Sequence, residues 1–307
     1  MRFICLSDIH GTYQNSIGRK DNIGEAFESK ITYVFDYAQK NKCAILQAGD
    51  LNDKARNWRV LDFLIDTIRS HSVEVFCVYG QHDLYLRRPP EKSASVLSIL
   101  NKACQSLYIL DEERTGYGGV DLYGSNWGGE IPYPENNNRR RILVLHAPIA
   151  KRKEYPGHDY TSPKYFLKKH PMFDLVLVGD VHKKIYCHYD NRYLINTGPM
   201  LRLEATEYNM RHKPCFYVYD SKRHSLKKEI IPHQSSEEIL TREHIETKNF
   251  SSSELEEFTS TIKNFEPMDV HRREKMIAFA KKYIEDNRVI EIVTEVVDGK
   301  YNSNIRK

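Results

Sequence analysis

The chain has 307 residues, of which 40% are apolar and 29% are charged, which suits one large globular domain with a small appendage. Its net charge of +4 permits a polyanionic partner but does not require one. No apolar run approaches membrane-spanning length and no signal peptide is recognisable, so we expect a protein of the cytoplasm (the host cytoplasm if the source is viral) that makes no membrane contact.

The first half of the chain alternates apolar runs with helical patterns. Strands are predicted at residues 2–7, 44–47 and 74–79, separated by helices over about 22–40 and 58–70. Apolar strands that alternate with helices are typical of parallel pairing with the helices outside the sheet. The expected fold therefore belongs to the α/β class.

After a helix near residues 93–103 the chain becomes richer in strands. They are predicted at residues 107–110, 120–124, 142–146, 175–178, 185–188, 193–195, 215–219 and 226–231. A second mixed sheet packed on the first would explain this half. We therefore expect a four-layer αββα sandwich of two mixed β-sheets flanked by helices.

The composition changes again beyond about residue 232. A possible capping box at Ser253 and Glu256 precedes a short helix, and a longer helix is predicted from about Asp269. We expect a main domain at residues 1–232 and a short helical C-terminal appendage at residues 233–307. The appendage either packs on the main domain as a helical layer or serves as a capping or partner-docking element.

Five short segments carry Asp or His at the ends of predicted strands. They are Ser7–His10, Gly49–Asp53, Gly80–Asp83, Leu145–Ala147 and Gly179–His182. Loops at the carboxyl ends of parallel strands converge on one edge of a sheet. One such segment would be an ordinary turn, but five in this order predict a dinuclear metal centre.

The residue types in these segments suit phosphoester hydrolysis. Two cations about 3.5–4 Å apart neutralise the anionic phosphate and activate the attacking water. Asp8 and His10 are spaced so that both side chains reach the same face. Asp50 follows a glycine, which permits close backbone approach, and it fits the bridging carboxylate.

These residues resemble the motifs of calcineurin-like metallophosphoesterases, which run D-x-H, G-D-x-x-D, G-N-H-[D/E], H and G-H-x-H. The resemblance covers roughly residues 1–220. Within that superfamily, Gln47–Asp50, Tyr79–Asp83 and Asn196–Arg202 look closest to the SbcD-type and phage recombination endonuclease subunits. The resemblance implies a DNA exonuclease or endonuclease of recombination and repair, a homodimer with an SbcC-like coiled-coil ATPase as partner.

The resemblance also implies roles for individual residues. The first metal would be held by Asp8, His10, Asp50 and His182, and the second by Asp50, Gln81, His146 and Asp180. The catalytic residues would be His82, which assists the leaving oxygen, and Asp83, which, like Asp53, would orient nearby groups.

Two departures from the family pattern fall on the second metal. Gln81 stands where Asn is usual and Asp180 where His is usual. Both residues keep a ligand atom, and the added carboxylate favours Mn²⁺ or Mg²⁺ over zinc. The alternatives are a phosphodiesterase or phosphatase for nucleotides or small phosphoesters, and a scaffold whose altered second site no longer catalyses.

Basic side chains adjoin several of the segments, and we expect them to contact DNA. They are Arg87, Arg88, Arg139, Arg140, Lys151, Arg152 and Lys183. Solvated loop charge would explain any one run, but several runs near loops that converge on a metal site are what a DNA groove needs. Tyr13, Tyr85 and Tyr133 are interpreted as ordinary loop aromatics rather than base-stacking residues.

Overall fold

The structure is a computed structural model that describes residues 1–243, apart from residues 89–91, 93–94, 112–113, 135–136, 153 and 155–158. Residues Met1–His244 form one compact unit. The C-terminal helices expected near Ser253 and Asp269 lie outside the described residues. Within the described part, no helix is both long and apolar enough to cross a membrane.

The first of two six-stranded sheets has the order β12-β11-β1-β2-β3-β4. Its strands are β1 (Arg2–Leu6), β2 (Cys43–Gln47), β3 (Val75–Cys77), β4 (Leu107–Ile109), β11 (Cys215–Asp220) and β12 (Ser225–Ile230). Strands β1 to β4 pair in parallel, whereas β11 runs antiparallel to both β1 and β12. The sheet is therefore mixed, as expected.

The second sheet has the order β5-β6-β7-β8-β10-β9. Its strands are β5 (Thr115–Tyr117), β6 (Val120–Ser125), β7 (Arg140–His146), β8 (Leu175–Gly179), β9 (Ile185–Tyr189) and β10 (Arg192–Asn196). Strands β6, β7, β8 and β10 are parallel, and an antiparallel strand closes each edge.

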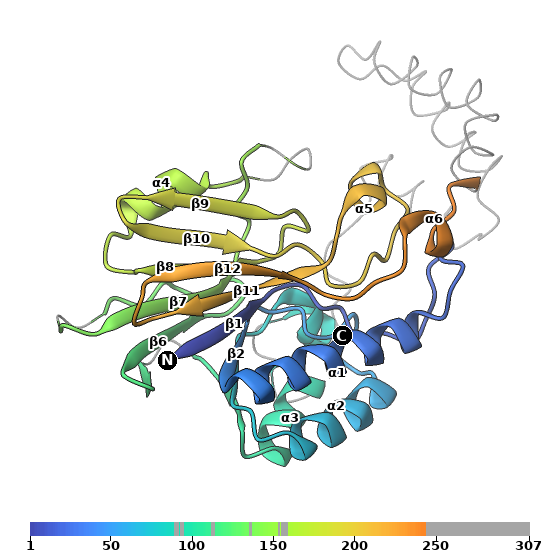
Figure 1. The fold of residues 1–307 in the computed structure, drawn as a ribbon, viewed down its shortest axis with the longest axis horizontal. Helices are drawn as coiled ribbons and strands as arrows, with labels where there is room; N and C mark the ends of the chain where they lie inside the picture. The colour runs from blue at the N-terminus through green and yellow to red at the C-terminus, as the bar shows by residue number, and fades with distance from the viewer. Residues whose placement is uncertain are drawn as a thin grey trace, which may run out of the picture. The chain divides into compact units, whose positions relative to one another are not determined.

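Helices cover the outer faces of both sheets (Figure 1). The larger ones are α1 (Ile23–Asn41), α2 (Trp58–Ser70) and α3 (Val96–Ala103) on the first sheet and α4 (Pro163–Lys169) on the second. The remaining ones are the short helices α5 (Glu207–Arg211) and α6 (Ser236–Ile239) and the 3₁₀ turns η1 (Gln81–Asp83) and η2 (Tyr85–Arg87).

The alternation of side chains along each strand builds separate cores. In β1, Ile4 and Leu6 pack against the helices, while Phe3 and Cys5 pack between the two sheets. A third apolar cluster, which includes Phe166 of α4, lies on the other face of the second sheet. A strand buried on both faces must be apolar at successive positions, which explains its continuous apolar run. The expected αββα sandwich is confirmed.

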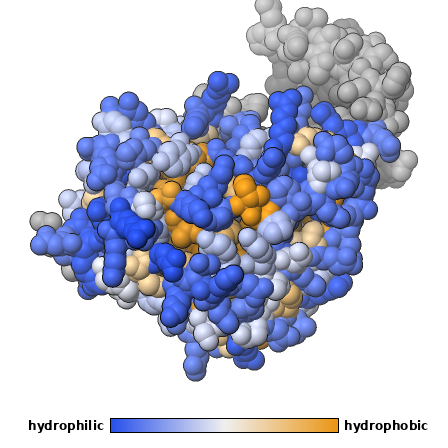
Figure 2. All heavy atoms as spheres, viewed as in Figure 1, coloured by the Kyte–Doolittle hydropathy of each residue, from blue (hydrophilic) through white to orange (hydrophobic). Residues whose placement is uncertain are grey.

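The parallel strands bring their carboxyl ends to the same edge. In Figure 1, β1 starts at the N-terminus on the left and runs to the right, so the loops that follow the parallel strands gather on the right. Most of the surface in this view is hydrophilic, and apolar side chains gather near its middle (Figure 2). The fold therefore presents the motif loops together.

Candidate metal centre

The five motif segments follow five parallel strands and meet at one edge. They lie at or just after the ends of β1, β2, β3, β7 and β8. Backbone contacts tie neighbouring loops together, since the His10 amide donates to the Asp50 carbonyl at 2.9 Å and Gly11 forms a bridge with Asn52. The structure therefore brings all seven residues expected to bind metal to one place.

Four of these residues form the first cluster. The ligand atoms of Asp8, His10, Asp50 and His182 all lie within 4.8 Å of one another. His10 Nε2 is 2.9 Å from His182 Nε2 and 3.6 Å from Asp50 Oδ2. Two histidines and two carboxylates at this spacing are a donor set that suits a divalent cation.

The other side of Asp50 faces a second cluster. His146 Nε2 is 3.5 Å from Asp50 Oδ2 and 3.8 Å from Asp180 Oδ1. The Gln81 side-chain amide donates to Asp180 Oδ1 at 3.1 Å. The two positions at which the chain departs from the family pattern therefore contact each other.

Asp50 lies between the clusters and offers one oxygen to both. Its Oδ1 accepts the His82 backbone amide at 2.8 Å. Its Oδ2 has no hydrogen-bond partner, although it is buried between His10 and His146. A single carboxylate oxygen between two imidazoles is the geometry that a bridging ligand requires.

Several buried polar atoms at this edge have no hydrogen-bond partner. They include Asp8 Oδ2, Asp50 Oδ2, Gln81 Oε1 and His146 Nε2 on the expected ligands, together with His10 Nδ1 and Asn52 Oδ1. An unsatisfied buried polar group costs about 1–3 kcal/mol, so several of them on the residues of two adjoining clusters need a shared explanation. Divalent cations would supply the missing partner to the four ligand atoms, and the residues present fit that role.

Burial and mutual charge shift the protonation of these groups. Burial raises the pKa of Asp8 to about 6 and lowers that of His10 to about 3, so His10 is a neutral imidazole with a lone pair to donate. Burial also acts to lower the pKa of His146, but the Asp50 carboxylate outweighs it and raises that pKa to about 10. A proton therefore occupies His146 where a cation would otherwise sit.

The ligand residues have an unusual backbone. Asp8, His10, Asp50 and Asp180 have φ values of 48°, 49°, 53° and 96°, in the left-handed region. Residues other than glycine rarely adopt this conformation, and it persists only where the surrounding structure enforces it, commonly at functional sites. Gly80 allows the close approach of two loops, because a Cβ there would collide with the Asp50 carboxylate.

His82 and Asp83 have different positions. His82 is half-buried, and its Nδ1 donates to the Asp53 carbonyl at 2.8 Å, so Nε2 is the nitrogen that this bond does not engage. His82 also forms a second group with His10 and Asp53, whose ligand atoms lie within 4.8 Å of one another. Asp83 is fully buried and accepts the backbone amides of Gly80 and Asn52, each at 3.0 Å. Asp83 therefore holds the second and third segments together, which fits the orienting role.

A buried polar network that the sequence did not indicate supports the first and fifth segments. Asn196 accepts a hydrogen bond from Ser7 Oγ at 2.9 Å and donates to the Val181 carbonyl at 2.8 Å. The Met200 amide donates to the Asp8 carbonyl at 3.2 Å, and Lys30 donates to the Met200 carbonyl at 3.0 Å. Only resemblance had indicated the turn at Asn196, and Lys30 lies on a helix far away in sequence.

Two of the expected DNA-binding arginines do not lie beside the metal centre. Arg139 and Arg140 are at the amino end of β7, and His146 is at its carboxyl end, roughly 20 Å away for a strand of this length. Arg139 forms an ion pair with Asp121 at 3.2 Å and Arg140 with Asp174 at 2.5 Å. The expectation that they flank the site is therefore wrong.

The other expected DNA contacts remain close to the motif loops. Arg87 and Arg88 are exposed and follow η1, and Lys151 and Arg152 are exposed after β7. Lys183 follows His182 and forms an ion pair with Glu154. Their contact with DNA stays a prediction.

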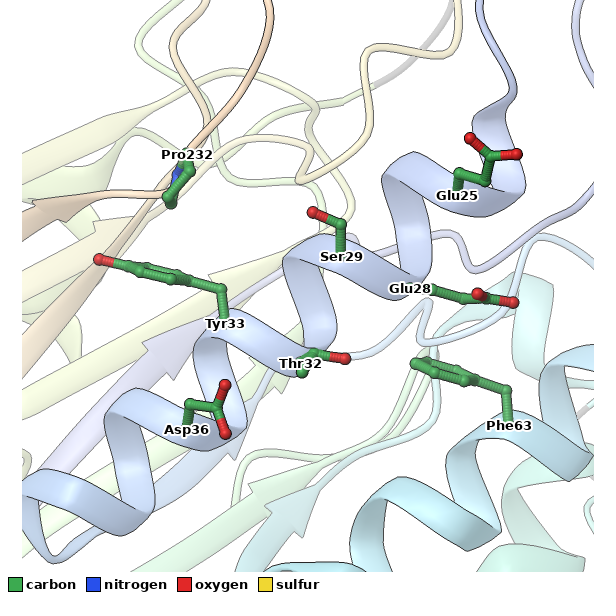
Figure 3. Close-up of a pocket in the computed structure, with 8 residues that line it drawn as sticks. All are labelled: Glu25, Glu28, Ser29, Thr32, Tyr33, Asp36, Phe63 and Pro232. Atoms are coloured by element: carbon green, nitrogen blue, oxygen red, sulfur yellow. The ribbon is translucent and has the colours of Figure 1, made fainter.

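A separate surface hollow of about 580 Å³ lies between α1 and α2. Figure 3 shows three carboxylate side chains around it, those of Glu25, Glu28 and Asp36, together with Phe63 of α2. Carboxylates repel phosphate. This hollow is therefore not a continuation of a phosphoester site.

A family model described as calcineurin-like phosphoesterase matches residues 1–184. No match was found among curated proteins. Similar solved structures include TT1561 of Thermus thermophilus (14% identity, TM-score 0.49, covering 75% of this chain and 99% of that chain). Others are an archaeal phosphodiesterase (12%, 0.43, 75% and 99%) and zinc-complexed Vps29 of Entamoeba histolytica (12%, 0.38, 75% and 98%).

Proposed function

The chain belongs to the calcineurin-like phosphoesterase family, and from this premise we propose that it is a nuclease that hydrolyses phosphodiester bonds with two divalent cations. The observation that carries the proposal is Asp50 Oδ2, which is buried without a hydrogen-bond partner between His10 and His146. A single cation would leave one of the two clusters without a partner.

Each cluster would hold one cation. The first would use Asp8, His10, Asp50 and His182, and the second Asp50, Gln81, His146 and Asp180. When bound, two such cations neutralise the phosphate and lower the pKa of the attacking water. The many carboxylate and amide oxygens in the second set favour Mn²⁺ or Mg²⁺.

The protein's own residues would orient the phosphodiester and deliver a proton. His82 Nδ1–H is held by the Asp53 carbonyl, so Nε2 is the atom that can protonate the departing sugar oxygen. Asp83 would keep His82 in place through the Gly80 amide. A backbone carbonyl also orients His146, because the His146 Nδ1 donates to the Ala48 carbonyl at 2.7 Å.

DNA is the substrate that the surrounding charge and the motif resemblance favour. Exposed cations follow the third and fourth segments, at Arg87, Arg88, Lys151 and Arg152. The SbcD-like motifs extend the proposal to a homodimer that works with an SbcC-like ATPase. Co-purification with an ATPase encoded beside this chain would test that partner.

One comparison tests the hydrolase and its substrate together. With Mn²⁺, the purified chain should cleave both linear DNA and bis-p-nitrophenyl phosphate, and calorimetry should give two Mn²⁺ per chain. His82→Ala should abolish DNA cleavage but keep both cations. Cleavage of the small ester without DNA cutting or binding would favour a small-phosphoester enzyme, and one cation or none without turnover would favour a scaffold.

A further inference from the structure

Cationic and aromatic side chains gather beside the motif segments, from the loop after β1, the start of α2 with the loop before it, and the turn η2. We call this set the basic-aromatic rim; it consists of Tyr13, Lys54, Arg56, Trp58, Arg59 and Tyr85. The Arg56 guanidinium lies over the Tyr85 ring at 3.7 Å, and that of Arg59 lies over the Tyr13 ring at 3.8 Å. These two stacks join the start of α2 and the loop before it to η2 and to the loop after His10.

The rim adjoins the candidate ligands. Tyr13 lies three residues after His10, and Tyr85 lies three residues after His82. Lys54 follows Asp53, whose carbonyl accepts the His82 imidazole. A linear polymer bound along the rim would therefore reach the metal centre within the length of a few residues.

The charge of the rim suits a polyanion. Residues 54–61 contain three exposed cations and no acidic side chain. Among the residues that the structure describes, Lys54 and Arg59 form no ion pair, whereas Arg139 and Arg140 do. Lys54 donates to the Gln14 side-chain oxygen at 2.9 Å, and Arg59 lies over Tyr13, whose hydroxyl donates to the Glu28 carboxylate at 2.5 Å. Since neither cation forms an ion pair of its own with a described residue, both can meet phosphate.

The aromatic rings narrow the class of polyanion. Trp58 begins α2 and is 62% exposed, which is unusual for so large an apolar ring. Phosphate needs only the cations, whereas an exposed indole gains by stacking on a flat apolar partner. Unpaired bases offer such faces, while the bases of a duplex are stacked on one another.

We infer that the basic-aromatic rim binds single-stranded nucleic acid, with Trp58 stacking on a base and the arginines contacting the flanking phosphates. The inference rests on the proposed function, since the bound strand would lead into the proposed metal centre. It revises the interpretation of Tyr13 and Tyr85 as ordinary loop aromatics, because each ring supports an arginine of the rim.

Tryptophan fluorescence offers a direct test. The chain has two tryptophans, Trp58 and the partly buried Trp127, so Trp127→Phe leaves Trp58 as the only emitter. We expect a twelve-nucleotide oligo(dT) to quench this emission in the presence of a chelator, which prevents cleavage. A blunt duplex of equal length should quench far less. Binding of the oligonucleotide without quenching, or equal quenching by the duplex, would overturn the inference.

Affinity measurements separate stacking from charge. Trp58→Ala should weaken oligo(dT) binding by roughly tenfold or more. Arg56→Ala with Arg59→Ala should lower the slope of log affinity against log salt by about 1.4, or about 0.7 for each phosphate that is no longer neutralised. Lys102→Ala, an exposed charge in the last turn of α3, is the matched control and should leave the slope unchanged. An unchanged slope in the double variant would refute the arginine contacts.

A parallel assay keeps the two proposals distinct. Hydrolysis of bis-p-nitrophenyl phosphate by the unmodified chain with Mn²⁺ reports on the proposed hydrolase alone. Hydrolysis without Trp58 quenching would refute nucleic-acid binding by the rim and support the proposed hydrolase. Quenching without hydrolysis of either the ester or DNA would support nucleic-acid binding by the rim and refute the proposed nuclease. Oligo(rU) in the same titration distinguishes RNA from DNA as the bound strand.

Discussion

Asp50 and Asp121 are both fully buried, yet they lie at opposite ends of the parallel strands and in opposite surroundings. Asp121, near the amino end of β6, is 3.2 Å from Arg139 and 3.6 Å from Arg114, and accepts an Asn137 hydrogen bond at 2.7 Å. Asp50, after the carboxyl end of β2, faces His10 and His146, and its Oδ2 accepts no hydrogen bond.

The difference separates a structural carboxylate from a ligand. Asp121 Oδ1, like Asp50 Oδ2, has no hydrogen-bond partner, but two guanidinium groups lie 3.2 and 3.6 Å from it and neutralise its charge. In the described part of the chain, Asp50 has no arginine or lysine beside it: its neighbours are the imidazoles of His10 and His146, which can bind a cation, and the Asp8 carboxylate. A buried carboxylate that faces imidazoles and a second carboxylate, rather than guanidinium groups, is therefore the stronger indication of a metal site.

The largest expected effect follows from removing the shared charge at Asp50. Asp50→Asn should reduce Mn²⁺-dependent hydrolysis by at least about 10³-fold, because both clusters lose their common ligand. Differential scanning fluorimetry should show that Mn²⁺ raises the Tm of the unmodified chain but not that of the variant. A variant that Mn²⁺ still stabilises would place the bridging charge elsewhere.

Acidity should then distinguish the two clusters. Since burial raises the pKa of Asp8 to about 6, the first cation should lose affinity only below about pH 6, where Asp8 takes up a proton. Asp50 raises the pKa of His146 to about 10 against the effect of burial. His146 therefore carries a proton throughout the neutral range, and the second cation must displace it. Its affinity should fall about tenfold per pH unit from pH 8 to pH 6.

Calorimetry at several pH values, in buffers of different ionisation enthalpy, would measure these protons directly. Release of close to one proton on filling the second site at pH 7, and almost none on filling the first, is the expected result. Equal release at both sites would show that the proton is shared between the clusters.

Asp121 should give the converse result to Asp50. Asp121→Asn should lower the free energy of unfolding by about 1–3 kcal/mol, because Arg114 and Arg139 lose their common partner but remain 43% and 40% exposed and can be hydrated. Mn²⁺ affinity should not change. Urea denaturation in a chelator measures the first quantity and calorimetry the second. A loss of Mn²⁺ affinity would show that Asp121 acts on the metal centre and has no purely structural role.

The smallest expected effect concerns the contact between Gln81 and Asp180. Gln81→Asn and Asp180→His should each weaken the second cation, since each breaks the hydrogen bond at 3.1 Å. The double variant restores the usual family pair. It should lose less Mn²⁺ affinity than the two single variants lose together, with a coupling free energy of about 0.5–1.5 kcal/mol. Strict additivity in calorimetric Mn²⁺ titrations would mean that the two departures act independently.

Much of the fold could be predicted from the sequence because its signals are local. The helix expected at residues 58–70 is α2, and the expected strands coincide with β1 to β4 and β6 to β12 within a few residues. Strand β5 and helices α4, α5 and α6 were not predicted. The three helices have four to seven residues, too few for a helical period to emerge, and β5 has the sequence Thr-Gly-Tyr, without the apolar run that marks β3 and β4.

The misplaced arginines show a different limit. Arg139 and Arg140 are close to His146 in sequence, but an extended strand carries them to the other end of the sheet. Conversely, Trp58 and Arg59 belong to a helix and were given no role, although they lie beside the loop after His10. Sequence distance is a poor guide to spatial distance wherever strands cross the molecule.

The sequence by itself determined the αββα layers, the order of the five segments and the residue types available for metal. These depend on periodicity and on chemistry, which are properties of short stretches of chain. Only the tertiary structure decided that Asp50 lies between two clusters, that Gln81 contacts Asp180, and that Asp121 lies beside guanidinium groups while Asp50 lies beside imidazoles. The physical reason is that hydrogen bonding and charge compensation depend on which loops meet in space, and strand pairing over long separations sets those meetings.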